Sequence, residues 1–392
     1  MILIAKILFF VSLTGIIHTY VLYPLLMILL HRVKGSSEKP GITQESDLPS
    51  VEIIFAAYNE EAVIAEKIKS SFLSHYPANK ISLHLGSDRS SDGTDRIVAE
   101  LQNDYPSLKI TRFEERTGKS GIINQLVKNS EADLLILTDA NIIFEKATIP
   151  TLVAGLNDPK TGAVGGSIQY RELYERGISK QENTYLQLEN RLKEAESDLL
   201  KNAMGLEGGC YIIRRELFPQ IPPLFFMEDF FVSLAVMEQG YQVLFDQNAR
   251  CFEDVSTAST EEYKRKTRIS IGNFQNLGRF KKLIWTRFYP LGFAFVSHKV
   301  LRWFTPFFLV LLLLCSVLLS AESRLFSLFS GIYFLFLSAG LFGILFSQSK
   351  SLSWLKYPGH FIHMNLALLR GFFIYIKGVK SNVWQPTTRN QN

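Results

Sequence analysis

The sequence is poor in cysteine and carries no large surplus of either charge. Its three cysteines, Cys210, Cys251 and Cys315, are far apart in a chain of 392 residues and lack C-x-x-C spacing. Neither a disulfide framework nor a zinc site is therefore indicated, and we expect reduced thiols. The 42 lysines and arginines exceed the 37 acidic residues by only five. Because a nucleic-acid-binding face needs a strong surplus of positive charge, we expect no nucleic-acid partner.

Three long segments lack charged residues altogether. No Asp, Glu, Lys or Arg occurs in residues 7–30, 303–321 or 325–349. An apolar helix of about 20 residues can cross the hydrocarbon core of a membrane. The sequence therefore predicts a membrane anchor near the N-terminus and a helical hairpin through the membrane near the C-terminus. A cleaved signal peptide is the alternative for the first segment, but its apolar region would span only about 7–15 residues.

Basic residues flank these segments and predict an orientation. Three clusters of them lie on the side of the region between the anchors: Arg32, Lys34 and Lys39, then Lys281, Lys282, Arg287, Lys299 and Arg302, then Lys350 and Lys356. By the positive-inside rule this side is the cytoplasm, so we expect an integral protein of the plasma (inner) membrane with a cytoplasmic domain. Residues 285–302 and 357–376 are expected to lie in the headgroup layer as amphipathic or re-entrant helices. A buried helix is the alternative for the first of these two segments.

The region between the anchors alternates strands and helices. Each of its short apolar runs is followed by a helical pattern, and these runs are Val51–Ala57, Ile81–Leu85, Leu108–Phe113 and Asp133–Leu137. The alternation predicts βαβ units in a mostly parallel sheet. In such sheets ligands bind beyond the carboxyl ends of the strands, so the residues that follow each strand are the candidates for a site.

Polar residues with recognisable chemistry follow the strands. Asp139-Ala140-Asn141 offers a carboxylate and a carboxamide after one strand, and oxygen ligands of this kind suit Mg²⁺ or Mn²⁺. Asp88 follows another strand and can contact a ligand. Thr117-Gly118-Lys119 precedes a helix, where backbone N–H groups and a lysine suit a phosphate. Each motif alone also fits a simpler role, because Asp and Asn are common in turns and at helix caps.

Two further charged groups occur later in the chain. Met227-Glu228-Asp229 begins a helical pattern, and adjacent carboxylates can divide their work between fixing geometry and accepting a proton. Arg265 and Arg268 lie three residues apart on one face of a later helical pattern, where they can hold a diphosphate. The alternatives are an acidic pair that only starts a helix and a basic helix that contacts anionic lipid.

In their order along the chain, these motifs resemble those of the family 2 glycosyltransferases, which include cellulose, chitin, hyaluronan and poly-N-acetylglucosamine synthases. The matching residues are Tyr58-Asn59-Glu60-Glu61, Ser87–Thr94, Gly118-Lys119, Asp139-Ala140-Asn141, Met227-Glu228-Asp229 and Arg265-x-x-Arg268-Ile269. The resemblance implies an α/β fold of the GT-A type, a Rossmann-like nucleotide-diphospho-sugar transferase domain inserted between transmembrane helices. With the apolar segments it divides the chain into an anchor (1–31), a linker (32–50), the GT-A domain (51–284), an interfacial segment (285–302), a transmembrane hairpin (303–349) and an interfacial or re-entrant helix with a basic tail (350–392).

The resemblance also implies a role for each matching residue. Asp88 and Glu60 would lie at the nucleotide, and Lys119 at the nucleotide or diphosphate. Asp139 and Asn141 would hold Mg²⁺ or Mn²⁺ and the diphosphate. The catalytic residues would be Asp229 as the general base, its acidic neighbour Glu228, and Arg268 near the diphosphate and acceptor channel. Arg265, on the same motif, would help to bind the nucleotide sugar. The implied partners are a nucleotide-sugar donor, expected to be a UDP-sugar, and an acceptor that is a membrane lipid, a lipid-linked glycan or a polysaccharide.

Departures from the family pattern bear on the reaction. Ser87 and Asn141 each stand where many members have an Asp, but each motif keeps one carboxylate. Arg265 and Ile269 replace the Gln and Trp of the Q-x-x-R-W motif, which is associated with processive chain growth. We therefore expect transfer to a lipid-linked or envelope glycan. A processive polysaccharide synthase and an inactive membrane scaffold are the alternatives.

Overall fold

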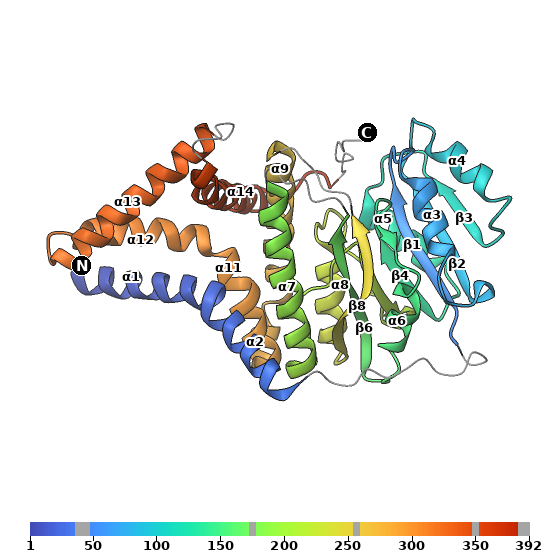
Figure 1. Cartoon of the computed structure of the whole chain (residues 1–392), viewed down its shortest axis with the longest axis horizontal. Coiled ribbons are helices and arrows are strands. Elements are labelled where there is room, and N and C mark those ends of the chain that lie inside the picture. Colours follow the sequence, from blue (N-terminus) through green and yellow to red (C-terminus); the bar gives the residue numbers. More distant parts are fainter. Residues whose placement is uncertain (36–47, 172–177, 254–258, 347–352, 383–392) are drawn as a thin grey trace. The chain divides into compact units, whose positions relative to one another are not determined.

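The structure of the chain, a computed structural model, describes residues 1–35, 48–171, 178–253, 259–346 and 353–382. It contains two compact units (Figure 1). One comprises Met1–Leu26 and Ser259–Gly378, and the other comprises Met27–Ala258 and Val379–Asn392. Lys39 and Lys350, on which the predicted orientation partly rests, lie outside the described residues, as does most of the predicted linker.

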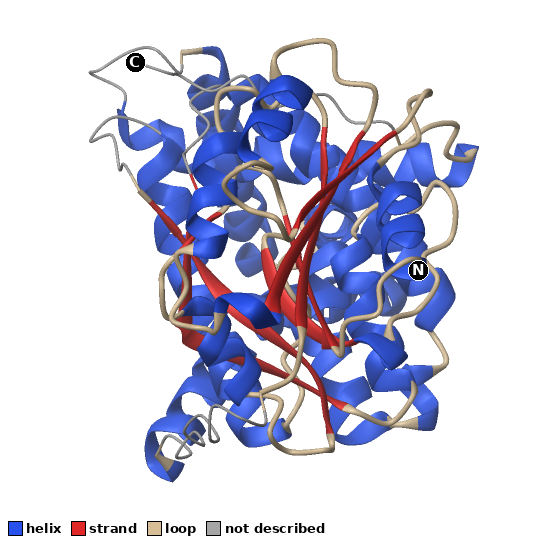
Figure 2. Cartoon of the chain, turned by 90° about the vertical axis from the view of Figure 1, so that its right-hand side faces the viewer, coloured by secondary structure: helices blue, strands red, loops and turns tan. Residues whose placement is uncertain are grey.

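A mixed sheet of eight strands forms the centre of the second unit (Figure 2). The strand order is β3-β2-β1-β4-β7-β6-β8-β5. Strands β1 to β4 run parallel, as the alternation of strands and helices predicts, whereas β7 runs antiparallel to both β4 and β6. The α/β class is therefore confirmed. The strands are β1 (Val51–Ala57), β2 (Ile81–Ser87), β3 (Leu108–Arg112), β4 (Leu134–Thr138), β5 (Ile143–Phe144), β6 (Thr161–Tyr170), β7 (Cys210–Arg214) and β8 (Gln242–Glu253).

Helices cover both faces of this sheet, and the alternation along β2 shows which helix lies on which face. Leu83 and Leu85 belong to the core that also contains residues of α3, α4 and α6. Gly86 faces the other side, where a Cβ atom would lie 2.2 Å from Ile122 of α5. The helix α5 therefore packs on the face opposite to α3. The helices of this unit are α3 (Ile64–Phe72), α4 (Thr94–Leu101), α5 (Lys119–Lys128), α6 (Thr148–Ala154), α7 (Ile178–Leu200) and α8 (Glu228–Glu238).

A short strand, β5, lies between β4 and α6, where the sequence predicts no strand. Ile143 and Phe144 pair in antiparallel fashion with Phe252 and Cys251 of β8. Two residues carry too short a pattern to predict a strand, and their partner comes much later in the chain. The pairing brings the end of β8 beside the segment that follows β4.

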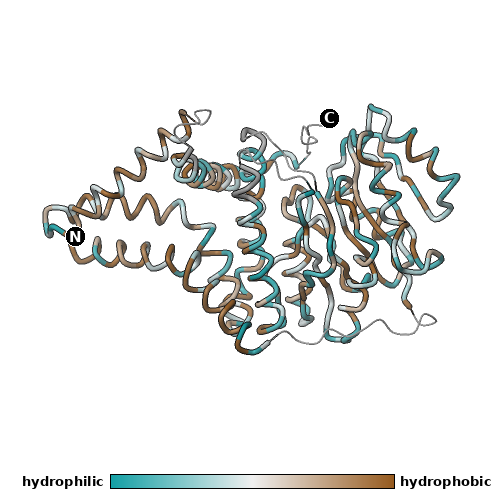
Figure 3. Tube along the Cα trace, in the orientation of Figure 1, coloured by the Kyte–Doolittle hydropathy of each residue, from teal (hydrophilic) through white to brown (hydrophobic). Residues whose placement is uncertain are grey.

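The other unit is helical, and its helices α1, α12 and α13 are strongly apolar (Figure 3). Among the described residues, Ile2–Lys34 and Arg324–Leu345 are long and apolar enough to cross a membrane. Phe288–Trp303 and Thr305–Leu319 meet at a bend of 63° and add a third crossing only if the bent pair spans as one. The helices are α1 (Ile2–Ile17), α9 (Ser259–Phe280), α10 (Leu283–Thr286), α11 (Leu301–Trp303), α12 (Thr305–Leu319), α13 (Arg324–Leu345) and α14 (Lys356–Lys377), and α2 (Tyr23–Lys34) begins in this unit and ends in the other.

The two segments predicted to lie in the headgroup layer are largely helical. Residues 285–302 contain the π-helical stretch Phe295–Val300 and, before it, a segment whose backbone is interrupted by an extended Tyr289, and residues 357–376 lie within α14. Within this unit α13 and α9 each pack against α14. The position of both segments in the headgroup layer stays a prediction.

A buried lysine lies beneath the end of β4. Lys67 of α3 is fully buried, and its Nζ donates a hydrogen bond of 2.9 Å to Oγ1 of Thr138 and lies 3.6 Å from the centre of the Phe144 ring. Thr138 Oγ1 in turn donates to the carbonyl oxygen of Gly209 (2.7 Å). Burial lowers the pKa of Lys67 to about 7. The amine thus fixes the last residue of β4, which directly precedes Asp139.

We expect Lys67→Met to change how stability depends on pH. Between about pH 7 and its usual pKa of 10.5, Lys67 is neutral in the folded chain and protonated in the unfolded chain. The unfolded state then binds more protons, so this group makes the free energy of unfolding rise with pH, by up to about 1.4 kcal/mol per unit. Lys67→Met should lose this rise. The measurement is the free energy of unfolding of the detergent-solubilised chain across this pH range.

Lys69→Met is the matched control, because Lys69 lies on the same helix and is exposed. The difference in the free energy of unfolding between Lys69→Met and the wild type should stay constant with pH. The same pH dependence in both variants would contradict a neutral Lys67.

Candidate active site

The candidate site lies at the carboxyl ends of parallel strands. Ala57 ends β1, Ser87 ends β2 and Thr138 ends β4, and β1 pairs in parallel with both other strands. All three strands therefore end at one edge of the sheet. The segments that follow carry Asp88 and Asp139, so the structure brings these predicted site residues to the same edge.

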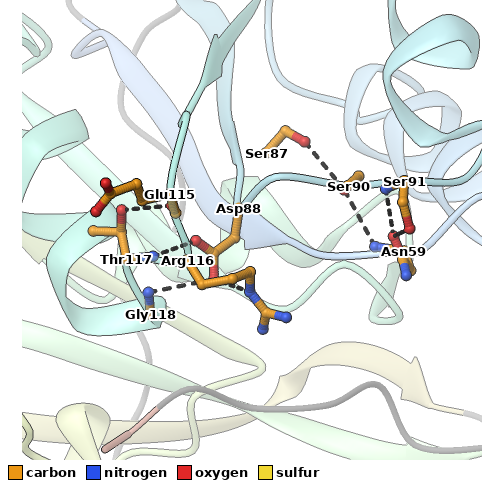
Figure 4. Close-up of polar contacts among 9 residues, drawn as sticks. All are labelled: Asn59, Ser87, Asp88, Ser90, Ser91, Glu115, Arg116, Thr117 and Gly118. Atoms are coloured by element: carbon orange, nitrogen blue, oxygen red, sulfur yellow. Dashed lines mark hydrogen bonds and ion pairs between the residues drawn. The ribbon is translucent and has the colours of Figure 1, made fainter.

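Asp88 organises the loop that precedes α5 (Figure 4). Its side chain is fully buried and accepts hydrogen bonds from the backbone N–H groups of Thr117 (2.6 Å) and Gly118 (3.3 Å) and from Nε of Arg116 (3.1 Å). Gly118 has a φ of +80°, a conformation that favours glycine. Asp88 therefore shapes the predicted phosphate-binding segment, and its contact with a nucleoside stays a prediction.

A second set of contacts joins the segments that follow β1 and β2. The backbone N–H of Ser91 donates to Oδ1 of Asn59 (2.8 Å), and the backbone N–H of Asn59 donates to Oγ of Ser90 (3.2 Å) (Figure 4). The guanidinium of Arg116 lies 3.3 Å from the centre of the Tyr58 ring. Sequence reasoning missed this stacked pair, although an aromatic residue directly after a strand is a signal for it.

Lys119 is held between two carboxylates. Its Nζ lies 2.6 Å from Oδ1 of Asp139 and 2.5 Å from Oε1 of Glu228. Burial acts to lower the pKa of Lys119, but the two carboxylates together raise it well above its usual value. The amine is therefore a fixed positive charge, and it joins the first turn of α5 to the end of β4 and the start of α8.

Asp229 lies beside this cluster, at the start of α8. Its Oδ2 accepts a hydrogen bond from the backbone N–H of Gly208 (2.7 Å), and its Oδ1 accepts one from the backbone N–H of Phe230 (2.7 Å). A Cβ atom on Gly208 would lie 3.2 Å from Asp229 Oδ2 and 3.4 Å from Lys119 Nζ, so both groups lie next to this glycine. Burial and the neighbouring Glu228 raise the pKa of Asp229 to about 7. The carboxyl group can therefore both accept and release a proton near neutral pH.

The loop that leads to Gly208 is supported by a second buried lysine. Lys193 of α7 forms an ion pair with Glu207, which directly precedes Gly208. Burial acts to lower the pKa of Lys193, but Glu207 and Glu189 outweigh it and raise that pKa. Sequence reasoning missed this pair, because one charged residue among many on a long helix gives no signal of its burial.

Asp139 and Asn141 follow β4 and carry the oxygen atoms of the predicted metal site. The Asp139 side chain is 40% exposed, whereas Asn141 is buried. Asn141 Nδ2 donates a hydrogen bond of 3.0 Å to Oε1 of Glu253, the last residue of β8. Sequence reasoning missed Glu253, because its proximity depends on the pairing of β5 with β8. In the part of the chain that the structure describes, no group of three or more His, Cys, Asp and Glu residues is arranged to hold a metal ion.

The remaining predicted site residues are distributed over both units. The backbone N–H of Glu60 donates to Oγ1 of Thr94 (2.8 Å), which ties it to the start of α4. Arg265 and Arg268 lie on α9, in the helical unit, where Arg265 is exposed and its Nη1 lies 3.8 Å from Oε2 of Glu262. The roles of these residues stay predictions.

Two family models match the chain. The model described as "Glycosyl transferase family 2" matches residues 52–221, and the one described as "Glycosyl transferase family group 2" matches residues 155–346. Together they cover most of the α/β unit and continue into the helical unit. Their order agrees with the order of the motifs along the chain.

Similar proteins of known sequence carry glycosyltransferase names. "Probable glycosyltransferase YdaM" of Bacillus subtilis (strain 168) is 34% identical over 127 residues, which are 31% of this chain and 30% of that protein. "Beta-monoglucosyldiacylglycerol synthase" of Trichormus variabilis is 34% identical over 122 residues, which are 31% of this chain and 26% of that protein. The chain thus matches less than a third of the length of these relatives.

A solved structure shares the fold of the chain. It is the mannosyltransferase PcManGT from Pyrobaculum calidifontis in complex with GDP-Man and Mn²⁺, with a TM-score of 0.67 and 19% sequence identity over 94% of this chain and 99% of that one. The similarity confirms the GT-A fold that the motifs imply. Motifs, family models and fold agree, and the chain therefore belongs to family 2 of the glycosyltransferases, a family of enzymes.

Proposed function

We propose that the protein is an inverting glycosyltransferase that moves a sugar from a nucleotide-sugar donor to a membrane-associated acceptor. One observation carries the proposal: Lys119 lies between Asp139 and Glu228, and the Asp229 carboxyl group, with a raised pKa, lies next to them. This edge of the sheet thus combines a cation for a phosphate, oxygen ligands for a metal and a proton acceptor. An inverting single displacement at a nucleotide sugar needs these three elements together.

The donor nucleotide is proposed to bind along the loop before α5. Asp88 fixes the backbone of Thr117 and Gly118 there, and a helix N-terminus favours an anionic group. Tyr58 and Arg116 form a stacked planar pair beside this loop, which suits contact with a nucleobase or ribose. Glu60 is proposed to lie near the nucleotide on the strength of its motif.

Asp229 is proposed to be the general base. The acceptor hydroxyl attacks the anomeric carbon, its proton passes to the Asp229 carboxylate, and the nucleoside diphosphate leaves from the opposite face of the sugar. Base assistance of this kind typically contributes about 10²–10⁴-fold to the rate. The backbone N–H groups of Gly208 and Phe230 hold the carboxylate in place. Glu228 completes the acidic pair and holds Lys119.

Positive charge must balance the leaving diphosphate. Lys119 supplies one fixed charge, and Arg268 and Arg265 are proposed to supply more, as in the family motif. A divalent ion, Mg²⁺ or Mn²⁺, fits the oxygen donors of Asp139 and Asn141, since such ions take few protein ligands and complete their coordination with substrate phosphates and water. When bound, the ion supplies charge stabilisation to the diphosphate.

The acceptor is proposed to be a membrane lipid or a lipid-linked or envelope glycan. Two helices long and apolar enough to cross a membrane support an acceptor at the membrane, because a soluble acceptor needs no such attachment. The name of one similar protein, "Beta-monoglucosyldiacylglycerol synthase", contains a lipid, and this supports a lipid acceptor. The basic flanks support a position at the plasma (inner) membrane with the α/β unit in the cytoplasm. A processive polysaccharide synthase is less well supported, because Arg265 and Ile269 depart from the Q-x-x-R-W motif.

Asp229→Asn should abolish transfer and spare donor binding, because the carboxamide has a similar shape but accepts no proton. The expected loss of rate is about 10²-fold or more. Release of UDP or GDP from a panel of nucleotide sugars, by the membrane-embedded protein with native lipid extract, measures the rate. Glu131→Gln, which alters an exposed carboxylate before β4, is the control. Near-normal turnover of Asp229→Asn would refute the assignment, and no release from any donor by the folded wild type would favour the scaffold alternative.

The rate should rise with pH, with a midpoint near 7. The base must be deprotonated to accept the hydroxyl proton, and burial together with Glu228 keeps Asp229 partly protonated below its pKa of about 7. Glu228→Gln removes the neighbouring negative charge, so its midpoint should move to lower pH. Profiles of kcat/KM against pH for the two proteins test this, and coincident midpoints would contradict the coupling between the two carboxyl groups.

A further inference from the structure

The segment after β4 contains a carboxamide where many related motifs hold a carboxylate, and an acidic residue from elsewhere in the chain lies beside it. Asn141 is buried, and its Nδ2 lies 3.0 Å from Oε1 of Glu253. The contact joins residues 112 positions apart. The contact therefore depends on the fold and not on the local sequence.

The backbone fixes this contact. Ile143 and Phe144 pair with Phe252 and Cys251, so β5 aligns the end of β8 with the segment that carries Asn141. The backbone N–H of Arg171 also donates to the carbonyl oxygen of Glu253 (3.1 Å), which continues the pairing of β6 with β8. Glu253 is therefore held from two sides, and its carboxylate faces the segment that follows β4.

The separation and the charge both suit a shared metal ion. Two neighbouring ligands of an octahedral Mg²⁺ ion, each at about 2.0–2.1 Å, lie about 3 Å from each other. Asn141 Nδ2 donates a hydrogen bond of 3.0 Å to Glu253 Oε1, so a rotation of the carboxamide would bring its oxygen to a similar distance from this carboxylate. Asp139 alone would give the ion one carboxylate. Glu253 would add a second negative charge, which the neutral carboxamide of Asn141 does not supply.

We propose that Glu253 is the second carboxylate ligand of the divalent ion, beside Asp139 and Asn141. The inference deepens the proposed function and rests on its metal site. Asn141 Nδ2 donates to Glu253 Oε1, and rotation of the carboxamide would present its oxygen to an ion instead. Glu253 then replaces, from β8, the carboxylate that the Asp139-Ala140-Asn141 motif lacks.

Binding of Mn²⁺ to the full chain in detergent tests this without any measurement of transfer. The electron paramagnetic resonance signal of free Mn²⁺ gives the affinity, alone and with UDP or GDP. Asp139→Asn and Glu253→Gln should each weaken binding about tenfold or more, a loss typical of metal sites. Asn141→Asp combined with Glu253→Gln should restore most of the affinity, because the carboxylate returns at the neighbouring position. Glu131→Gln should bind as the wild type does, and unfolding temperatures should show that all variants are folded.

The outcomes separate this inference from the proposed function. If Asp139→Asn weakens binding and Glu253→Gln does not, Glu253 is no ligand and the metal site at Asp139 stands. If neither weakens binding, the ion does not bind at Asp139, and the metal site of the proposed function fails together with the ligand role of Glu253. If Glu253→Gln weakens binding and Asn141→Asp does not restore it, the carboxylates are not interchangeable and the ligand role is overturned.

Discussion

The candidate site depends on one protonated amine. Lys119 contacts Asp139 and Glu228 at 2.6 and 2.5 Å, and Asp229 lies beside them, so three carboxyl groups surround a single positive charge. Without the amine, these acids would repel one another and would shift toward their neutral forms. With it, the cluster still carries more negative than positive charge. A nucleoside diphosphate adds further negative charge, so its binding requires cations besides Lys119, which is the physical reason to expect a divalent ion.

The sequence predicted the parallel half of the sheet and the residues at its edge, because these depend on local patterns. Four short apolar runs form the strands β1 to β4, and the residues that follow β1, β2 and β4 lie together by the geometry of parallel pairing. Glu253 could not be found in this way. Its place beside Asn141 depends on β5 and β8, whose pairing joins distant parts of the chain and leaves no periodic signal.

The burial of Lys67 and Lys193 is a second feature that is hard to predict from the sequence. Lys67 follows Ile64 and precedes Ile68 on the apolar face of α3, a position where an amphipathic pattern predicts a hydrophobic residue. That mismatch is a usable signal, although a single lysine at such a position is ordinarily taken as exposed. Lys193 gives no comparable signal, because the helix α7 that carries it is charged along its length.

The two buried lysines explain how loops, rather than regular elements, can hold the acids in place. Lys67 binds Thr138, and Thr138 binds the carbonyl oxygen of Gly209, so the residue before Asp139 is tied to the loop after Gly208. Lys193 holds Glu207 on the other side of that loop. The backbone N–H of Gly208 then holds Asp229. Hydrogen bonds and ion pairs thus connect the segment that carries Asp139 to Asp229. A substitution of either lysine should displace Asp139 and Asp229 together, because the same short loop joins them.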